Sequence, residues 1–169
     1  MLWEEGQMKP SKARRNLQSV LVVLLVAVVA IQFIPVRRSN PPKLYADPLE
    51  LHSGVYPILR DSCYDCHSNV TQWPWYSRVA PVSWLVARDV NLGREQLNFT
   101  EWHLLAREER VELALEIVEK VEQGAMPQPR YLILHPEAEL TEADKFVLVG
   151  WTAESRDFPG APGQDYRRF

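Results

Sequence analysis

The chain opens with one long apolar segment, and later stretches repeat their apolar positions at a helical period. Residues 17–34 are apolar except for Gln18, Ser19 and Gln32. Coiled as a helix, this segment extends about 27 Å at ~1.5 Å per residue, close to the roughly 30 Å of a bilayer's hydrocarbon core. The pattern predicts one membrane-spanning helix near the N-terminus.

Two roles are open for this segment, a cleavable signal peptide and a retained signal-anchor. Cleavage needs small residues before the cut, and Val28-Val29-Ala30 meets that need only weakly. The apolar run continues to Ile34, which favours a retained anchor over residues 17–35. Basic residues flank the segment on both sides, but the four before it (Lys9, Lys12, Arg14 and Arg15) favour a cytoplasmic segment over 1–16.

The first helix of the folded part is predicted to begin near Asp47. The run Asp47-Pro48-Leu49-Glu50 supplies an N-cap acceptor, a proline at the first helical position and a glutamate at the third. An apolar stripe follows at helical spacing, made up of Leu51, Val55, Ile58 and Leu59. Pro57 lies inside this stripe and should kink the helix or shorten it to a few turns.

Two further helices are predicted in the middle of the chain. Residues 81–91 form a short one. A longer one starts at a Thr100 cap, continues from Glu101 to about Gln123 and ends at Gly124. Its apolar positions should face inward, and its glutamates should be solvated. The apolar set is Leu104, Val111, Leu115, Val118 and Val121, and the acidic set is Glu108, Glu112, Glu116, Glu119 and Glu122.

The last helix begins at Thr141, where Asp144 completes a near-capping box. It contains Phe146, Val147, Val149 and Trp151. No strand alternation and no repeat stand out along the chain. The sequence therefore predicts an all-α domain preceded by one transmembrane helix.

A polar, proline-containing run, residues 37–42, marks a linker over residues 36–46. A single domain over 47–156 and a loose Gly-, Pro- and charge-rich tail over 157–169 follow. Hydrophobic residues make up 46% and charged residues 24% of the 169 residues, as in an ordinary folded protein. Four of the 19 basic and two of the 22 acidic residues precede residue 36, so the remainder carries a net charge of about −5. This balance, without a basic stripe, argues against a nucleic-acid partner.

The two cysteines belong to the run Cys63-Tyr64-Asp65-Cys66-His67, a Cys-x-x-Cys-His motif. Two thiols within one helical turn can add to two vinyl groups on one edge of a porphyrin, and the adjacent imidazole can reach its iron. A redox dithiol would be expected in a βαβ setting, and a structural zinc site would need a fourth ligand at motif spacing. Neither is present, so the motif predicts one covalent haem c, with His67 as an iron ligand.

The sixth iron ligand is predicted to be Met126. It is the only methionine beyond the anchor, and it lies 59 residues after His67, between Gly124 and Pro127. A helix end followed by a proline-stiffened loop holds a sulfur at a fixed place, and a thioether raises the reduction potential of a haem. The alternatives are a Met126 that merely packs and a histidine ligand, for which His135, before Pro136, is a better candidate than His103.

The aromatic residues that follow the motif are candidates for the haem lining. Trp73, Trp75, Tyr76 and Trp84 would exclude water and so raise the potential, or form a core packed against the ring. Arg78 is a candidate partner for a haem propionate, with a solvated arginine as the alternative. The carbonyl of Pro74 or Pro81 is expected to accept the second ring N–H of His67.

These residues resemble the bacterial haem-binding domain family of small exported proteins, over roughly residues 50–153. A looser likeness is to class I cytochromes c, which also place a methionine at a similar distance after the histidine. That likeness implies an all-α, cytochrome c-like helical haem domain, in which the first and last helices cross near the haem edge and the Met126 loop lies on the distal side. The segments that carry the resemblance are Cys63–Asn69, Trp73–Tyr76, Ala80–Trp84, Leu97–Phe99, Met126-Pro127 and His135-Pro136.

Together these observations predict an electron carrier rather than an enzyme. It would be a single-pass protein of the cytoplasmic membrane with its haem domain in the periplasm or on the outer face, exchanging electrons with a redox protein or a membrane electron-transfer complex. The alternatives are a haem-based sensor or small-ligand-binding module, and a peroxidase, each with a labile or open sixth position. For a peroxidase, only His103 or His135 could supply a distal acid/base group.

Overall fold

The computed structural model describes residues 12–42 and 54–154, and every regular element among them is helical. The all-α prediction is confirmed for these residues. In chain order, with η marking a 3-10 helix, the elements are α1 (Lys12–Ile31), α2 (Tyr56–Ser62), α3 (Tyr64–His67), η2 (Trp75–Arg78), α4 (Val82–Gln96), η3 (Phe99–Leu104), α5 (Arg107–Glu122), α6 (Pro129–Leu132), η4 (Pro136–Ala138) and α7 (Glu142–Glu154).

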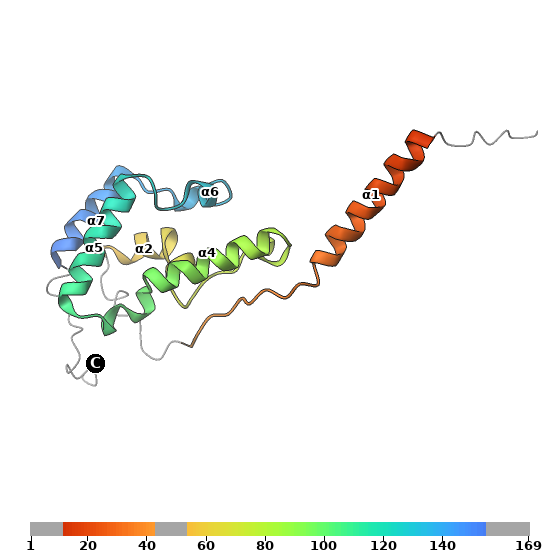
Figure 1. Cartoon of the computed structure of the whole chain (residues 1–169). Coiled ribbons are helices and arrows are strands. Elements are labelled where there is room, and N and C mark those ends of the chain that lie inside the picture. The colour runs from red at the N-terminus through yellow and green to blue at the C-terminus, as the bar shows by residue number, and fades with distance from the viewer. Residues whose placement is uncertain (1–11, 43–53, 155–169) are drawn as a thin grey trace, which may run out of the picture.

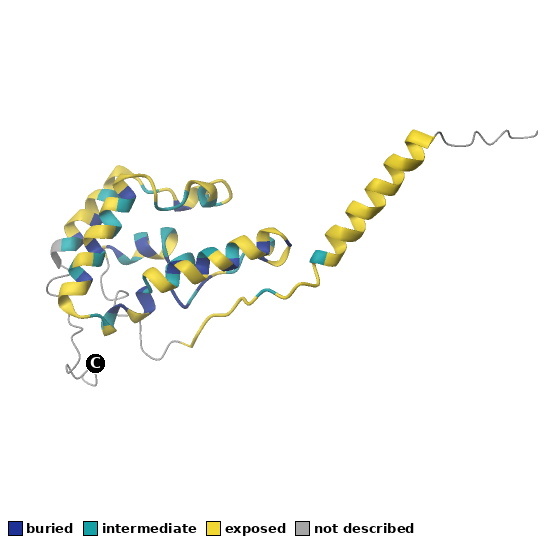
Figure 2. Cartoon of the chain, viewed as in Figure 1, coloured by how far each residue is buried: buried dark blue, intermediate teal, exposed yellow. Residues whose placement is uncertain are grey.

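The N-terminal helix α1 stands apart from the other helices (Figure 1) and has no buried residue. From Val20 onward its exposed surface is apolar, and Figure 2 shows the exposure along the helix. By length and composition, α1 can cross a membrane. A helix of this kind buries its apolar surface only in lipid or against a partner, since nothing in the rest of the described chain covers it.

The remaining helices enclose one core, in which aromatic rings pack in series. Tyr64 stacks on Phe99 at a centroid distance of 5.2 Å, Phe99 contacts Trp102, and Trp102 contacts Trp151 at 5.3 Å. Leu59 of α2 and Leu148 of α7 complete this core with no exposed surface. The series joins α3, η3 and α7, and α5 packs along α7 (Figure 1).

The long helix expected over 101–123 is divided in two. Leu105 and Ala106 are extended and separate η3 from α5. Thr100 is not the cap: its N–H donates to the side chain of Asn98 at 3.1 Å, and its hydroxyl accepts from the N–H of Asn69 at 2.9 Å. The division follows from the packing of Trp102. Its side chain enters the core from the 3-10 helix η3, and one continuous α-helix would not keep that placement.

The inward stripe of α5 also differs from the expected one. Leu104 and Leu115 are exposed, whereas Val121 is buried as predicted. Arg110 and Ala114, which lie outside the predicted stripe, are also buried. Arg110 donates from Nη1 to the carbonyl of Leu105 at 2.7 Å, so a cation closes the end of η3. All five glutamates of the acidic set are exposed, as predicted.

Two other helix boundaries differ from the expected ones. Helix α4 runs to Gln96, five residues beyond the predicted end. Helix α2 begins at Tyr56 with Pro57 in its first turn, where a missing N–H costs nothing. The predicted start at Asp47 and the tail over 157–169 lie outside the described residues.

The predicted stop at Gly124 is confirmed. Gly124 has a φ of 65°, a left-handed conformation that glycine adopts without strain. The N–H of Ala125 donates to the carbonyl of Lys120 at 2.9 Å, and the N–H of Gly124 donates to that of Val121 at 3.0 Å. This pair of bonds is a Schellman motif, and it ends α5 directly before Met126.

The predicted start of α7 is confirmed, and it yields a stability prediction. The hydroxyl of Thr141 accepts from the N–H of Asp144, and the N–H of Thr141 donates to the Asp144 carboxylate at 2.9 Å. Thr141→Ala should lower the free energy of unfolding by about 1 kcal/mol at pH 7. The measurement is urea unfolding of the full chain in mild detergent. Thr152→Ala is the matched control, because the Thr152 hydroxyl only back-bonds to Val149 within the helix.

The same cap predicts how this cost depends on pH. Hydrogen bonds from Thr141 lower the pKa of Asp144 below its ordinary value. A lowered carboxyl pKa contributes stability above the ordinary value, and this contribution is lost as pH falls through the lowered one. The cost of Thr141→Ala should therefore shrink at acid pH. A cost equal to that of Thr152→Ala at pH 7 would contradict the assignment.

The linker after α1 lies against the domain. Asn40 donates to the carbonyl of Thr71 at 2.9 Å, and its Oδ1 accepts from Trp73 Nε1 at 3.1 Å. Arg94 of α4 donates to the carbonyl of Ser39 at 2.7 Å, and Arg38 donates to the carbonyl of Ser77. These contacts attach the linker to the loop that follows the Cys-x-x-Cys-His motif.

Candidate functional site

The Cys-x-x-Cys-His run forms a single helical turn directly after α2, made up of Cys63 and the four residues of α3. Cys63 ends α2 and begins α3, and its carbonyl accepts from the N–H of His67 at 2.9 Å. Both cysteines are half-buried and free of any disulfide. One helical turn therefore presents two reduced thiols and an imidazole, as the motif predicted.

The ring of His67 is oriented by a backbone carbonyl. Its Nδ1 lies 3.2 Å from the carbonyl oxygen of Leu97. A carbonyl only accepts, so Nδ1 carries the proton and Nε2 keeps a lone pair for a metal. Burial lowers the pKa of His67, which favours the same neutral form.

The carbonyl that orients His67 belongs to Leu97, so the prediction of Pro74 or Pro81 for this role is wrong. Helix α4 ends at Gln96, and the next residue, Leu97, is extended. Its carbonyl is therefore not taken up by the helix and is available to His67. Every residue carries a carbonyl, so no residue type signals this role.

Helix α4 approaches the motif most closely at Gly93. A Cβ on Gly93 would lie 2.6 Å from the backbone oxygen of Cys66. Gly93→Ala should therefore lower the free energy of unfolding by about 2–3 kcal/mol. It should also reduce the amount of haem that the chain retains, because the turn that bears the thiols must shift.

Gly150→Ala is the matched control for Gly93→Ala, since a Cβ there would meet nothing within 4 Å. In a helix interior this change should be neutral or stabilising by up to about 1 kcal/mol. Urea unfolding followed by circular dichroism compares the two variants. Equal stability of both would show that α4 does not contact the motif so closely.

The environment of the two thiols suits neither rival of a haem site. Burial raises the pKa of Cys63 to about 12 and that of Cys66 to about 11, so both stay protonated at neutral pH. Redox dithiols need a thiol pKa that is lowered, not raised. No group of three or more His, Cys, Asp or Glu side chains gathers as a metal-binding cluster in residues 12–42 and 54–154, so these residues do not offer the four ligands of a structural zinc site.

The predicted lining residues take several different positions. Trp73 bonds to the linker, and Tyr76 bonds to His135 at 2.6 Å. Trp75 is 76% exposed, and Trp84 and Arg78 are also exposed. Trp75 and Tyr76 are in edge contact at a centroid distance of 5.8 Å. The contact of these five residues with a haem stays a prediction.

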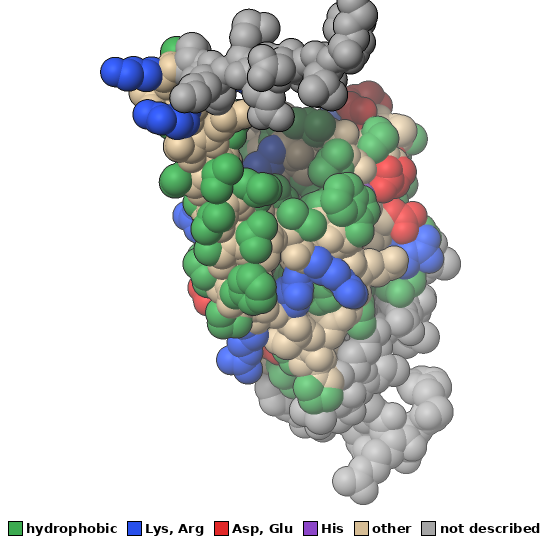
Figure 3. Space-filling view, turned by 90° about the vertical axis from the view of Figure 1, so that its right-hand side faces the viewer, with side chains coloured by type: hydrophobic (Ala, Val, Ile, Leu, Met, Phe, Trp, Pro, Cys, Tyr) green, Lys and Arg blue, Asp and Glu red, His purple; other side chains and the backbone are tan. Residues whose placement is uncertain are grey.

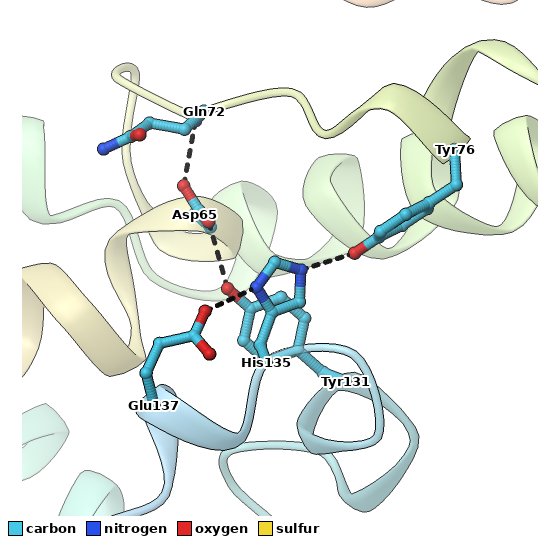
Figure 4. Close-up of polar contacts among 6 residues, drawn as sticks. All are labelled: Asp65, Gln72, Tyr76, Tyr131, His135 and Glu137. Atoms are coloured by element: carbon cyan, nitrogen blue, oxygen red, sulfur yellow. Dashed lines mark hydrogen bonds and ion pairs between the residues drawn. The ribbon is translucent and has the colours of Figure 1, made fainter.

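A polar network beside the motif was not anticipated from the sequence (Figure 4). Asp65 accepts from the N–H of Gln72 at 2.8 Å and from the hydroxyl of Tyr131 at 3.0 Å. Tyr131 in turn stacks on His135, with a centroid distance of 4.3 Å. Burial and the nearby Asp65 raise the pKa of Tyr131, which keeps its hydroxyl protonated. The network joins the motif to the segment after α6.

Both ring nitrogens of His135 are engaged in this network. Its Nδ1 lies 3.0 Å from the Glu137 carboxylate, and its Nε2 lies 2.6 Å from the Tyr76 hydroxyl. A carboxylate only accepts, so Nδ1 carries the proton and Nε2 accepts from Tyr76. His135 could therefore reach an iron only after breaking its bond to Tyr76.

Met126 follows the Schellman turn directly and is half-buried, with its N–H donating to the carbonyl of Lys120 at 3.2 Å. An open hollow of about 420 Å³ lies just beyond it, lined by Gln128, Pro129 and Arg130. His103, the other candidate, is half-buried in η3. Ligation by Met126 stays a prediction, and the engagement of His135 favours it.

Comparisons with known proteins agree with this chemistry. A family model described as a haem-binding domain matches residues 26–154. Cytochrome c peroxidase Ccp of Escherichia coli (strain K12) is 26% identical over 124 residues, which cover 71% of this chain and 27% of that protein. The chain therefore spans about a quarter of that relative's length. No solved structure matches the chain significantly.

Proposed function

The chain belongs to the haem-binding domain family, and from this membership we propose that it is a c-type cytochrome with one covalent haem. It would carry electrons at the outer face of the cytoplasmic membrane, held there by α1. The observation that carries the proposal is the single turn that presents two free thiols and an imidazole whose Nε2 is available.

The thiols of Cys63 and Cys66 would hold the group covalently. Each thiol would add across one vinyl group, with the sulfur bonding to one carbon and the hydrogen to the other. Nothing is oxidised or reduced in this step, so it needs no co-reactant. Because burial keeps both thiols protonated, the hydrogen that the addition requires is already present.

The haem, when bound, supplies one-electron chemistry between Fe(II) and Fe(III). His67 would ligate the iron through Nε2 while the Leu97 carbonyl fixes its ring. Met126 would supply a sulfur ligand that favours the reduced form and so raises the potential. The partner would be a redox protein or a membrane electron-transfer complex, and no basic stripe suits a nucleic acid.

A second candidate function is favoured by the relative's printed name, cytochrome c peroxidase. A peroxidase or a gas sensor needs an open or labile sixth position, and a peroxidase also needs an acid/base group beside it. The pair of Tyr76 and His135 could take that second role, since the Tyr76 hydroxyl donates to His135 Nε2 across 2.6 Å. Because the chain spans only about a quarter of that relative, the first proposal stands ahead of this one.

The test uses the full chain, produced with haem-attachment machinery and kept in its membrane. Acid–acetone treatment should leave the pigment on the protein, and a potentiometric titration should follow one electron with a low-spin spectrum in both states. Pigment stripped by the acid would contradict covalent attachment. Rapid CO binding by the reduced protein, or turnover of peroxide, would favour the second candidate.

A further inference from the structure

Five large apolar side chains lie exposed at two neighbouring places on the domain. We call them the apolar rim: Trp75, Val79, Val82, Ile133 and Leu134. Ile133 is 78% exposed and Leu134 58%, values typical of polar surface residues. Exposed apolar clusters of this kind mark interaction surfaces in soluble and membrane-associated proteins.

The two halves of the rim lie side by side because a hydrogen bond joins them. Tyr76 follows Trp75, and His135 follows Leu134. The Tyr76 hydroxyl and His135 Nε2 are 2.6 Å apart, and the two rings are in edge contact (Figure 4). The rim therefore consists of exposed residues on both sides of this contact, from η2, the start of α4 and the residues after α6.

This surface also lies beside the end of the apolar helix α1. Helix α1 ends at Ile31, and the next side chain, Gln32, forms two hydrogen bonds with Ala80. Ala80 N–H donates to Gln32 Oε1 at 2.9 Å, and Gln32 Nε2 donates to the Ala80 carbonyl at 3.2 Å. Since Ala80 is flanked by Val79 and Pro81, the rim meets the chain at the point where it would leave the bilayer.

We propose that the apolar rim is immersed in the lipid bilayer, at the boundary between headgroups and acyl chains. The proposal rests on the membrane anchoring of the proposed function. The occupant is lipid, because the Gln32–Ala80 contact brings the rim to the membrane boundary without any partner. Tryptophan is enriched at this depth in membrane proteins, and Trp75 is 76% exposed.

Charge on the same side of the molecule fits this occupant. Arg37, Arg38 and Arg78 are exposed near the rim and could reach lipid phosphates while their aliphatic stems lie along apolar surface. Figure 3 views the molecule from the side of α1, where hydrophobic side chains predominate, Lys and Arg are scattered among them and acidic side chains lie mainly near the edges. An immersed rim would hold the haem domain in one orientation on the membrane.

Another exposed apolar residue, Phe146, serves as a comparison for the rim. Phe146 of α7 is 80% exposed, but α7 lies at the end of the domain away from α1 (Figure 1). Exposure alone thus does not predict contact with lipid. The position relative to α1 does predict it, so we expect lipid contact at the rim and none at Phe146.

The test is photo-crosslinking of the full chain in phosphatidylcholine and phosphatidylglycerol vesicles whose lipids carry a diazirine in the upper acyl chain. Mass spectrometry then maps the lipid adducts. Adducts are expected on α1, on the peptide with Trp75 and Val79, and on the peptide with Ile133 and Leu134, but not around Phe146. Leu134→Glu should reduce the adducts near Trp75 several-fold, and Phe146→Glu should leave them unchanged.

Adducts on α1 alone would overturn the inference, and so would a rim shielded by a second copy or a partner protein. Absence of adducts on α1 as well would overturn it together with the anchoring. The covalent haem is read separately in the same samples, from the mass of the peptide that contains Cys63 and Cys66. Failure of the haem proposal is therefore distinguishable from failure of the rim.

Discussion

Replacing Cys63 and Cys66 together by alanine is expected to remove all covalently bound haem from the chain. The two thiols are the only groups that can form thioethers, because the chain has no other cysteine. His67 and its bond to Leu97 are untouched, so a haem could still be ligated but not retained under denaturing conditions. The measurement is haem staining on a denaturing gel with acid–acetone extraction of the matured, membrane-bound protein.

The single variants and a neighbouring variant serve as controls. Cys63→Ala and Cys66→Ala each leave one thioether, and their pyridine-haemochrome bands should shift because one vinyl group stays conjugated. Ser62→Ala, one residue before the motif, should keep full staining. The two substitutions should lower the free energy of unfolding of the haem-free chain by only about 1–2 kcal/mol, because both cysteines are half-buried. Full haem staining of the double variant would contradict covalent attachment through Cys63 and Cys66.

The parts of the fold that were predicted correctly depend on local sequence signals. An apolar run of spanning length gives α1, Gly124 gives the stop of α5, and Thr141 with Asp144 gives the start of α7. Each signal acts within a few residues through hydrogen bonds or steric limits, so the neighbouring sequence determines it.

The predictions that were wrong depended on distant partners. The break at Leu105 and Ala106 exists because Trp102 packs against Trp151, some fifty residues further along the chain. Arg110, which the predicted apolar stripe did not include, is buried for a similar reason, since it closes the end of η3. Helical periodicity assumes one uninterrupted helix, and it cannot show where tertiary packing interrupts one.

In the candidate site, too, the local features were predicted and the contacts between distant residues were not. The motif residues were predicted because their chemistry acts within one turn. The Leu97 carbonyl and the close approach of Gly93 were not, because a backbone atom has no signature in the sequence. Tyr131 and Asp65 are 66 residues apart, and only the folded chain brings them together. His135-Pro136 was noticed as a motif, but its bond to Tyr76 was not.

Replacing Met126 by leucine is expected to abolish the weak sulfur-to-iron absorption band and to lower the reduction potential by on the order of 100 mV. Leucine keeps most of the apolar volume of methionine, so packing after the Gly124 turn should be preserved while the sulfur is lost. Without its sixth ligand, the reduced iron should also bind CO rapidly. The measurements are optical spectra of both redox states and a potentiometric titration in the membrane.

The two histidine rivals give the matched comparison for Met126→Leu. His135→Ala and His103→Ala should both keep the sulfur-to-iron band, because neither ring would be a ligand. His135→Ala also breaks the bond to Tyr76, so any change in potential should be small next to that of Met126→Leu. A band that survives Met126→Leu would exclude the sulfur as ligand. A high-spin spectrum in His135→Ala alone would assign the sixth position to His135, which would first have to give up its contact with Tyr76.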